Sequence, residues 1–312
     1  MHWLDASGPY LRHELPALLL GVLTVFCGTV AHASPALIDD RGTAVALLPV
    51  PQRIVSLLPS LTESVCALGQ CDKLVGVDRY SDYPPRVRSL PTVGGGLDPN
   101  IEAIVALRPD LVLVASSAPG TERLRALGLR VMALEPKDSA NAQRVLFTLG
   151  QLLGVGTAKA LVQAMEADMQ AAIAQVPPRA RGQRVYFEIS PGPYAASTSS
   201  FLGQTLQRLG LKNMVEGSLG PFPKINPEMV VRAQPDVIMV GDSSADAMQT
   251  RPGWSKLTAL QNHRVCAFGK QEADVLVRAG PRMAQGAALV ARCLQNLYGE
   301  PSTPAIKKAS AP

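Results

Sequence analysis

The side chains that could do chemistry in this chain follow its predicted strands. Parallel α/β sheets bind their ligands beyond the carboxyl ends of the strands, so the residues at those ends are the first candidates. They form six groups: Pro59-Ser60, Arg79 to Tyr83, Ser116-Ser117, Pro191 to Tyr194, Asp242-Ser243 and Gly269 to Arg278. Serine, tyrosine and glycine dominate these groups, whereas pairs of a nucleophile and a base are scarce. This composition favours a site that holds a ligand over one that transforms it.

Histidine is in short supply for catalysis or metal binding. The chain contains four histidines, and only His263 follows residue 33. A Ser-His-Asp triad would have to use His263, which precedes a predicted strand and therefore lies at the wrong end of the sheet. The motifs GxSxG, HExxH and GxGxxG are absent. We predict no catalytic residue and no metal site, with an exported hydrolase that uses serine and His263 as the less favoured alternative.

Two tyrosines and one charged pair are the best candidates for ligand contacts. The rings of Tyr80 and Tyr194 could lie against a planar ligand, or each could pack on its own part of the fold. Asp274 and Arg278 are four residues apart, so on a helix they would pair with each other. In a loop they would instead offer an acceptor and a fork of donors to a ligand.

A repeated unit indicates how these residues are positioned. The segments NIEAIVALRPDLVLV (100–114) and NPEMVVRAQPDVIMV (226–240) share Asn, Glu, Val, Pro, Asp and Val in register, 126 residues apart. In each copy the asparagine can cap a helix, and Glu102 or Glu228 lies at its positive N-terminal end. The Pro-Asp pair then ends the helix before a short apolar strand. Two copies predict two similar lobes with a cleft, although one such unit is common in any α/β protein.

The order of the predicted elements sets the fold class. Strands alternate with helices in both halves, which predicts an α/β protein with two Rossmann-like lobes and largely parallel sheets. We place the first lobe at 34–138 and the second at 179–300. The segment 139–178 is helix-forming, with a glycine-rich break before a longer helix, and it predicts a linking helix between the lobes. Residues 301–312 are rich in Pro, Ala and Lys and predict a flexible tail.

Ser60 and Glu63 form a capping-box pattern after the first buried strand. The pattern predicts a helix that begins near Ser60 and ends at Leu68, because Gly69 is typical of the position after a helix. The predicted capping box gives the side chains of Ser60 and Glu63 a structural role at the start of this helix.

The first 33 residues have the features of an export signal. Arg12 and His13 precede an apolar run that reaches Val30, and Ala31-His32-Ala33 fits a cleavage site. A membrane anchor is the competing interpretation, but the run is short and contains Pro and Gly. Lipidation at Cys27 is disfavoured because Phe26 precedes it. We predict a signal peptide of residues 1–33 that is cleaved near Ala33.

Four cysteines follow this segment, and an even number in an exported protein favours disulfides over metal ligands. Cys66 and Cys71 flank a predicted helix end and could close a local loop. Cys266 lies in a predicted strand, and Cys293 lies in a terminal helix that could pack against it. Other pairings remain open.

The amino-acid composition of the chain argues against a disordered protein and against a nucleic-acid-binding protein. The chain is 47% hydrophobic and 18% charged, as expected for a compact fold. Its net charge is +5, but the basic residues are scattered and form no cluster that could bind phosphates. We therefore expect no nucleic-acid partner, and we expect a monomer.

Four motifs carry a resemblance to a known family. They are the opening Ile54 to Gly69, the stretch Tyr-Ser-Asp-Tyr-Pro-Pro from Tyr80, the Asn-x-Glu-x-Ile-Val-Ala-Leu-x-Pro-Asp unit, and Arg-Ala-Gly-Pro-Arg ending at Arg282. With them the chain resembles the family of the periplasmic cobalamin-binding protein BtuF. More broadly it resembles the substrate-binding proteins of ABC importers whose two lobes are joined by one rigid helix. The resemblance covers roughly Gln52 to Leu297, and the stiff connection implies small opening motions.

The resemblance implies roles for the candidate residues. Tyr80 would contact the corrin ring, with Tyr194 and Phe222 as aromatic neighbours, while Asp274 and Arg278 would stand near the amide side chains of the ligand. Cobalamin would be the transported ligand and not a cofactor, so no cofactor is expected. The protein would capture it in the periplasm.

Two departures from the family pattern affect these expectations. Gly96 stands where the cobalamin binder carries a tryptophan against the ring, which removes an apolar wall worth ~2 kcal/mol. A variant corrinoid, a haem or a ferric siderophore are therefore alternative ligands. A family cysteine expected near Leu209 is also absent, so the resemblance leaves Cys293 to pair with Cys266 or stay free.

The resemblance also implies a partner. In this family an acidic residue on the outer surface of each lobe meets arginines of the ABC permease in the inner membrane, and Glu102 and Glu228 match those positions. The alternative is that both glutamates serve only their helix N-termini.

Overall fold

The structure is a computed structural model that describes residues 35–241, 245, 248 and 250–299. The predicted signal peptide, the predicted tail 301–312 and the strand-end pair Asp242-Ser243 lie outside the described residues. The lobe boundaries proposed from the sequence stay a prediction.

The first sheet is entirely parallel and is buried on both faces. Its strands run in the order β4 (Leu74–Val77), β3 (Ile54–Ser56), β5 (Leu111–Val114) and β6 (Val131–Ala133). Along β5, Leu111 and Leu113 pack into one core, whereas Val112 and Val114 pack into the other. This alternation explains why the strand is a continuous apolar run: each of its side chains is buried on one face or the other.

Short helices and a hairpin complete the first lobe. The helices are α1 (Pro59–Ala67), η1 (Cys71–Lys73), η2 (Pro85–Ser89), α2 (Ile101–Ala106) and α3 (Thr121–Ala126), and the hairpin pairs β1 (Ala36–Ile38) with β2 (Ala44–Ala46).

The second sheet is largely parallel, as predicted. It runs in the order β11 (Val265–Phe268), β10 (Val237–Gly241), β7 (Arg184–Ser190) and β8 (Tyr194–Ala195), and β9 (Lys212–Asn213) also pairs with β7. Only β8 is antiparallel to its neighbour. The segments around it are η3 (Pro178–Ala180), α6 (Phe201–Arg208), η4 (Gly217–Leu219), α7 (Pro227–Ala233), η5 (Trp254–Lys256), α9 (Thr258–Gln261), α10 (Lys270–Val277) and α11 (Met283–Tyr298).

The repeated unit forms α2–β5 in the first lobe and α7–β10 in the second, and the predicted caps are present. The side chain of Asn100 accepts a hydrogen bond from the N–H of Ala103 (2.9 Å), and that of Asn226 accepts one from the N–H of Glu228 (3.0 Å).

The aspartate of each Pro-Asp pair has a matching structural role. Asp110 accepts the backbone N–H of Arg53 (3.0 Å) just before β3, and Asp236 accepts the N–H of Arg184 (2.8 Å) at the start of β7. Burial raises the pKa of Asp236, but hydrogen bonds from Arg184 lower it more, so its pKa lies below the ordinary value. Each aspartate thus holds the beginning of the neighbouring strand, which explains why the pair recurs.

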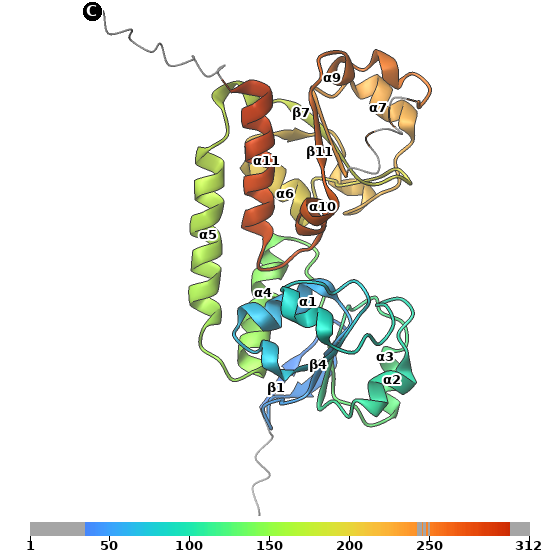
Figure 1. Cartoon of the computed structure of the whole chain (residues 1–312), viewed down its shortest axis with the longest axis vertical. Coiled ribbons are helices and arrows are strands. Elements are labelled where there is room, and N and C mark those ends of the chain that lie inside the picture. Colours follow the sequence, from blue (N-terminus) through green and yellow to red (C-terminus); the bar gives the residue numbers. More distant parts are fainter. Residues whose placement is uncertain (1–34, 242–244, 246–247, 249, 300–312) are drawn as a thin grey trace, which may run out of the picture. The chain divides into compact units, whose positions relative to one another are not determined.

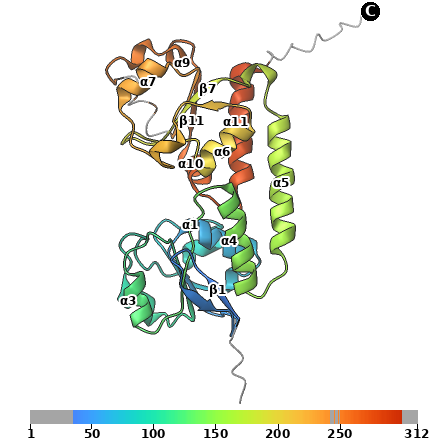
Figure 2. The same cartoon turned by 180° about the vertical axis from the view of Figure 1, so that it is seen from behind.

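Two helices connect the lobes. They are α4 (Ser139–Leu152) and α5 (Ala158–Ala174), with a break at the predicted place. In α5, Ala158 packs into the core of the first lobe, whereas Met169 packs into the core of the second. Figures 1 and 2 show α5 alongside α11. Helix α4 also contacts both cores, through Val145 and Ala142. The connection therefore consists of the predicted longer helix, α5, together with α4, which precedes the predicted break.

A buried ion cluster also joins the lobes, and it replaces the predicted capping box. No side chain caps α1, and Glu63 is 3% exposed. Its Oε2 accepts from Nε of Arg282 (2.8 Å), and its Oε1 accepts from Nη2 of Arg282 (2.5 Å) and Nη1 of Arg278 (3.0 Å). The capping-box prediction is wrong, because the carboxylate is used by two guanidiniums from the other lobe. We call Glu63, Arg278 and Arg282 the interlobe cluster.

Replacing Glu63 with glutamine should lower the free energy of unfolding by about 3 kcal/mol, because Arg282 then stays buried without a carboxylate partner and Arg278 keeps only Asp82 and Asp274. Chemical denaturation of the purified protein measures this. Glu122→Gln is the matched control: Glu122 also pairs with two arginines, but its side chain is 71% exposed, and the change should stay below about 1 kcal/mol. Equal losses in the two variants would contradict a special role for the interlobe cluster.

Candidate ligand-binding site

A cavity of about 390 Å³ lies where strand ends of the first lobe face the second lobe. Its lining from the first lobe follows β3 and β6, as the strand-end rule predicts. The lining residues are Leu58, Pro59, Ser60, Tyr80, Glu135, Pro136, Phe201, Phe222, Asp274, Val277, Arg278 and Ala279. We call this cavity the cleft.

Tyr80 presents its ring to the cleft from a fixed backbone. Its N–H donates to Oδ1 of Asp78 (2.8 Å), and its carbonyl oxygen accepts from Nη2 of Arg278 (3.1 Å). Asp78 is buried, which raises its pKa, although hydrogen bonds from Ser81 and the Tyr80 backbone counteract this. Tyr80 itself is 62% exposed, so a large flat surface is available for a ligand.

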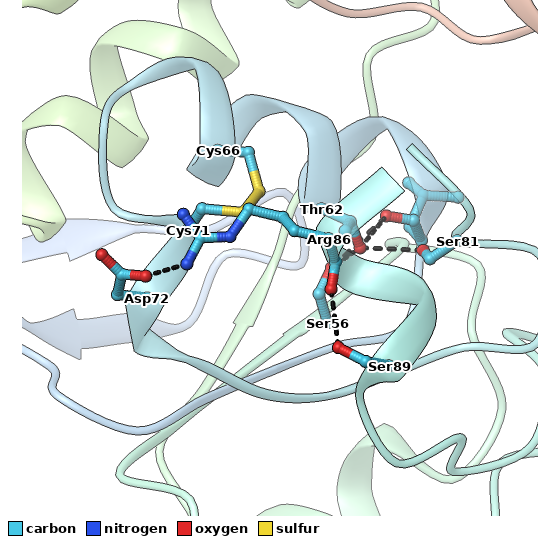
Figure 3. Close-up of a disulfide and its surroundings, with 9 residues drawn as sticks. Ser56, Thr62, Cys66, Cys71, Asp72, Ser81, Arg86 and Ser89 are labelled. Carbon is cyan, nitrogen blue, oxygen red and sulfur yellow. Dashed lines mark hydrogen bonds and ion pairs between the residues drawn. A yellow bond between two sulfur atoms is a disulfide. The ribbon is translucent and has the colours of Figure 1, made fainter. Parts of the chain in front are cut away.

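Buried hydroxyl groups attach the Tyr80 loop to the first lobe. Oγ1 of Thr62 donates to Oγ of Ser56 (2.9 Å) and lies 2.8 Å from Oγ of Ser81, which donates to Asp78 (2.5 Å). Figure 3 shows the hydroxyls of Ser56, Thr62 and Ser81 close together; of the three, Thr62 lies on α1, the helix that also carries Cys66. Sequence reasoning missed this group; the one signal in the sequence was Ser56 within the apolar run Ile54 to Leu58.

Asp274 lies in helix α10, and Arg278 directly follows the last residue of that helix, so the helical alternative of the two left open by the sequence is the one observed. Helix α10 begins after Gly269, whose N–H donates to Glu272 (3.3 Å). The two residues pair across one turn, with Nη2 of Arg278 3.4 Å from Oδ2 of Asp274. Arg278 also donates to Asp82 (2.8 Å) as well as to Glu63 and the Tyr80 carbonyl. Its donors are therefore directed at the protein itself.

The remaining predicted ligand contacts fall in different places. Phe222 lines the cleft, half-buried, with its ring edge-on to Phe201 at a centroid distance of 5.8 Å. Tyr194 lies in β8, is 43% exposed, and does not belong to the cleft lining. Gly96 does not belong to it either: a Cβ atom at Gly96 would lie 2.9 Å from the carbonyl oxygen of Leu57. The roles that the resemblance gave these residues stay predictions.

The polar lining of the cleft is dominated by acceptors. Glu135 is held by the backbone N–H of Ser117 (3.1 Å) and by the hydroxyls of Ser116 and Ser117. Asp274 is the second carboxylate, and Arg278 is the single cation among the lining residues. A ligand with N–H donors therefore fits this lining better than an anion does.

Glu102 and Glu228 lie away from the cleft lining, in the first turns of α2 and α7. Both are exposed, and Glu102 is 3.4 Å from Arg123 on the surface. An exposed apolar side chain follows each of them, Val105 on α2 and Met229 on α7. Each lobe thus carries an acidic residue with an apolar neighbour on a short helix.

Both disulfides that the sequence favoured are present. Cys66 pairs with Cys71 after α1, and Cys266 of β11 pairs with Cys293 of α11. Among the described residues, no group of three or more His, Cys, Asp or Glu side chains could hold a metal ion. None of the described helices has the length and apolar character needed to cross a membrane.

The chain belongs to the periplasmic binding protein family, which residues 54–272 match. It is 30% identical over 293 residues to YvrC of Bacillus subtilis (strain 168), an uncharacterized ABC transporter substrate-binding lipoprotein; the match covers 86% of this chain and 92% of that one. The fold resembles the periplasmic vitamin B12 binding protein BtuF of Vibrio cholerae, with a TM-score of 0.67, 26% identity, and coverage of 80% and 99%. It also resembles a periplasmic haem binding protein from Pseudomonas aeruginosa, with a TM-score of 0.69, 26% identity, and coverage of 80% and 93%.

The close approach at Gly96 can be tested by substitution. Gly96→Ala should lower the free energy of unfolding by about 1 kcal/mol, because its Cβ forces the Leu57 carbonyl to move. Gly156→Ala is the control, since a Cβ there meets nothing within 4 Å. Denaturation curves compare the two, and an equal stability of both variants would show that Gly96 has room for a side chain.

Proposed function

We propose that the protein captures a corrinoid outside the cytoplasm and delivers it to the permease of an ABC importer. Membership of the periplasmic binding protein family supports the receptor role, and the B12-binding relative supports the ligand class. The predicted signal peptide supports export to the periplasm. In this role the protein binds and releases its ligand without transforming it, so it is not an enzyme.

The observation that carries the ligand class is the donor and acceptor balance of the cleft. A haem brings two propionates, which need cationic partners, whereas the corrin ring of cobalamin is surrounded by amide groups that donate N–H. The carboxylates of Glu135 and Asp274 line the cleft; both already have partners in the protein, but a carboxylate has about four acceptor positions, and Oδ1 of Asp274 has no partner among the described residues. The single lining cation, Arg278, already donates to Glu63, Asp82 and the Tyr80 carbonyl oxygen. This balance supports a ligand with amide donors.

Haem is the second candidate because of one further observation. The phenol of Tyr80 lies in the cleft lining and is largely exposed, and a tyrosine oxygen can coordinate the iron of haem. A Tyr80→Phe change separates the two candidates. It removes the coordinating oxygen but keeps the ring that a corrinoid would contact.

Titration calorimetry with cyanocobalamin and with haemin tests the proposal. We expect saturable binding of cyanocobalamin, little effect of Tyr80→Phe, and at least about tenfold weaker binding in Tyr80→Ala, because that change removes a large apolar contact. Tyr194→Ala is the matched control outside the cleft lining, and its effect should be smaller. Tight haemin binding that depends on the Tyr80 oxygen, without binding of cyanocobalamin, would refute the corrinoid assignment.

We further propose that Glu102 and Glu228 dock the two lobes onto the permease. Charge reversal of both, Glu102→Arg with Glu228→Arg, should strongly reduce ligand uptake in cells while ligand affinity in solution stays unchanged, because both residues lie outside the cleft lining. The control is Glu122→Arg, another exposed glutamate in the first turn of a short helix. Uptake by the double variant equal to that of the control would eliminate the docking role.

A further inference from the structure

A second cavity, of about 580 Å³, lies between residues 82–88 of the first lobe and helices α10 and α11 of the second. Figure 1 shows the two helices next to each other. The cavity is larger than the cleft and shares only Asp274 with the cleft lining. The proposed corrinoid site uses none of its lining residues other than Asp274.

The carboxylates of this cavity already have partners. Asp82 accepts from Nη1 of Arg278 (2.8 Å), Asp274 pairs with the same arginine, and Glu272 accepts from the N–H of Gly269. Burial raises the pKa of Asp82, but the hydrogen bond and positive charge of Arg278 lower it more, so its pKa lies below the ordinary value. Each of these carboxylates therefore has a hydrogen-bond or ion-pair partner within the protein, and Asp82 and Asp274 share the guanidinium of Arg278.

The donors of the cavity are less occupied. Nε of Arg88 donates to the carbonyl oxygen of Asp82 (2.9 Å), but its two terminal nitrogens have no acceptor within the described part of the chain. Over the same residues, the side chains of Arg292, Gln271 and Gln285 have no hydrogen bond or ion pair. The hydrogen-bonding groups of the cavity that have no partner are thus mainly donors. Two of them are guanidinium groups, which favour oxyanions as partners.

An apolar surface lies beside these donors. The Tyr83 ring is 38% exposed, and the guanidinium of Arg282 lies over it at 4.0 Å from the ring centroid. Val275 of α10 and Leu289 of α11 line the same cavity and are only half-buried. A ligand that used the whole cavity would combine an anionic group with an apolar body.

We propose that this cavity is a binding site for a small amphipathic anion, an aromatic ring that carries a phosphate or a carboxylate. Arg88 and Arg292 hold the oxyanion, and Tyr83 and Leu289 contact the ring. Because Arg88 belongs to the first lobe and Arg292 to the second, one bound anion links the two lobes.

Titration calorimetry of the purified protein with phenyl phosphate tests this site, with benzoate and inorganic phosphate as companion probes. We expect saturable binding of phenyl phosphate and of benzoate, and clearly weaker binding of inorganic phosphate, which lacks the ring. Arg88→Gln and Arg292→Gln should each weaken phenyl phosphate binding by about tenfold. Both arginines are exposed, so the variants should fold, and circular dichroism checks this.

Arg86→Gln is the matched control. Arg86 lies in the same short helix as Arg88, but it pairs with Asp72 and does not line the cavity. It should leave phenyl phosphate binding unchanged, and so should saturation of the cleft with cyanocobalamin. The proposal is overturned by a lack of phenyl phosphate binding, by unchanged affinity in Arg88→Gln and Arg292→Gln, or by displacement of phenyl phosphate by cyanocobalamin.

Discussion

The carboxylate of Glu63 between two arginines of the other lobe is the interaction on which the site depends. Taking three charged groups out of water is costly, and their mutual attraction offsets this cost only when the geometry is good. Here Arg282 makes a bidentate contact with the carboxylate of Glu63, and Arg278 adds a third hydrogen bond. Such a cluster is better suited to fixing one arrangement of its parts than to adding stability.

The interlobe cluster fixes the elements that build the cleft. Glu63 lies in α1, whose first residues line the cleft. Arg278 holds the carbonyl oxygen of Tyr80 and the carboxylate of Asp82, so it positions the loop that presents the aromatic surface. Arg278 therefore supports the backbone of Tyr80, and its predicted contact with a ligand stays a prediction. With α4 and α5 also contacting both cores, the cleft is largely formed before a ligand arrives.

Local patterns were sufficient to predict most of the fold. The two copies of the Asn-to-Val unit, the apolar strands and the break before α5 depend on residues close together in the chain, and they were predicted. Strands β8 and β9 were missed because two residues are too short to leave a periodic pattern. Ser60 and Glu63 match the local sequence pattern of a capping box, but the carboxylate of Glu63 instead accepts a hydrogen bond from Arg278, which is 215 residues away. A pattern of neighbouring residues could not predict that distant partner. The four-residue spacing of Asp274 and Arg278 was compatible with a helix or a loop, and the structure has the helix α10 there.

A crystal structure of the protein with cyanocobalamin tests the central claim most directly, namely that the interlobe cluster shapes a cleft for a corrinoid. The account predicts a corrin ring against Tyr80 and Phe222, amide groups near Glu135 and Asp274, and Arg278 and Arg282 still bound to Glu63. A ligand seated elsewhere, or a cluster that opens so that Arg278 turns away from Glu63 toward the ligand, would contradict it.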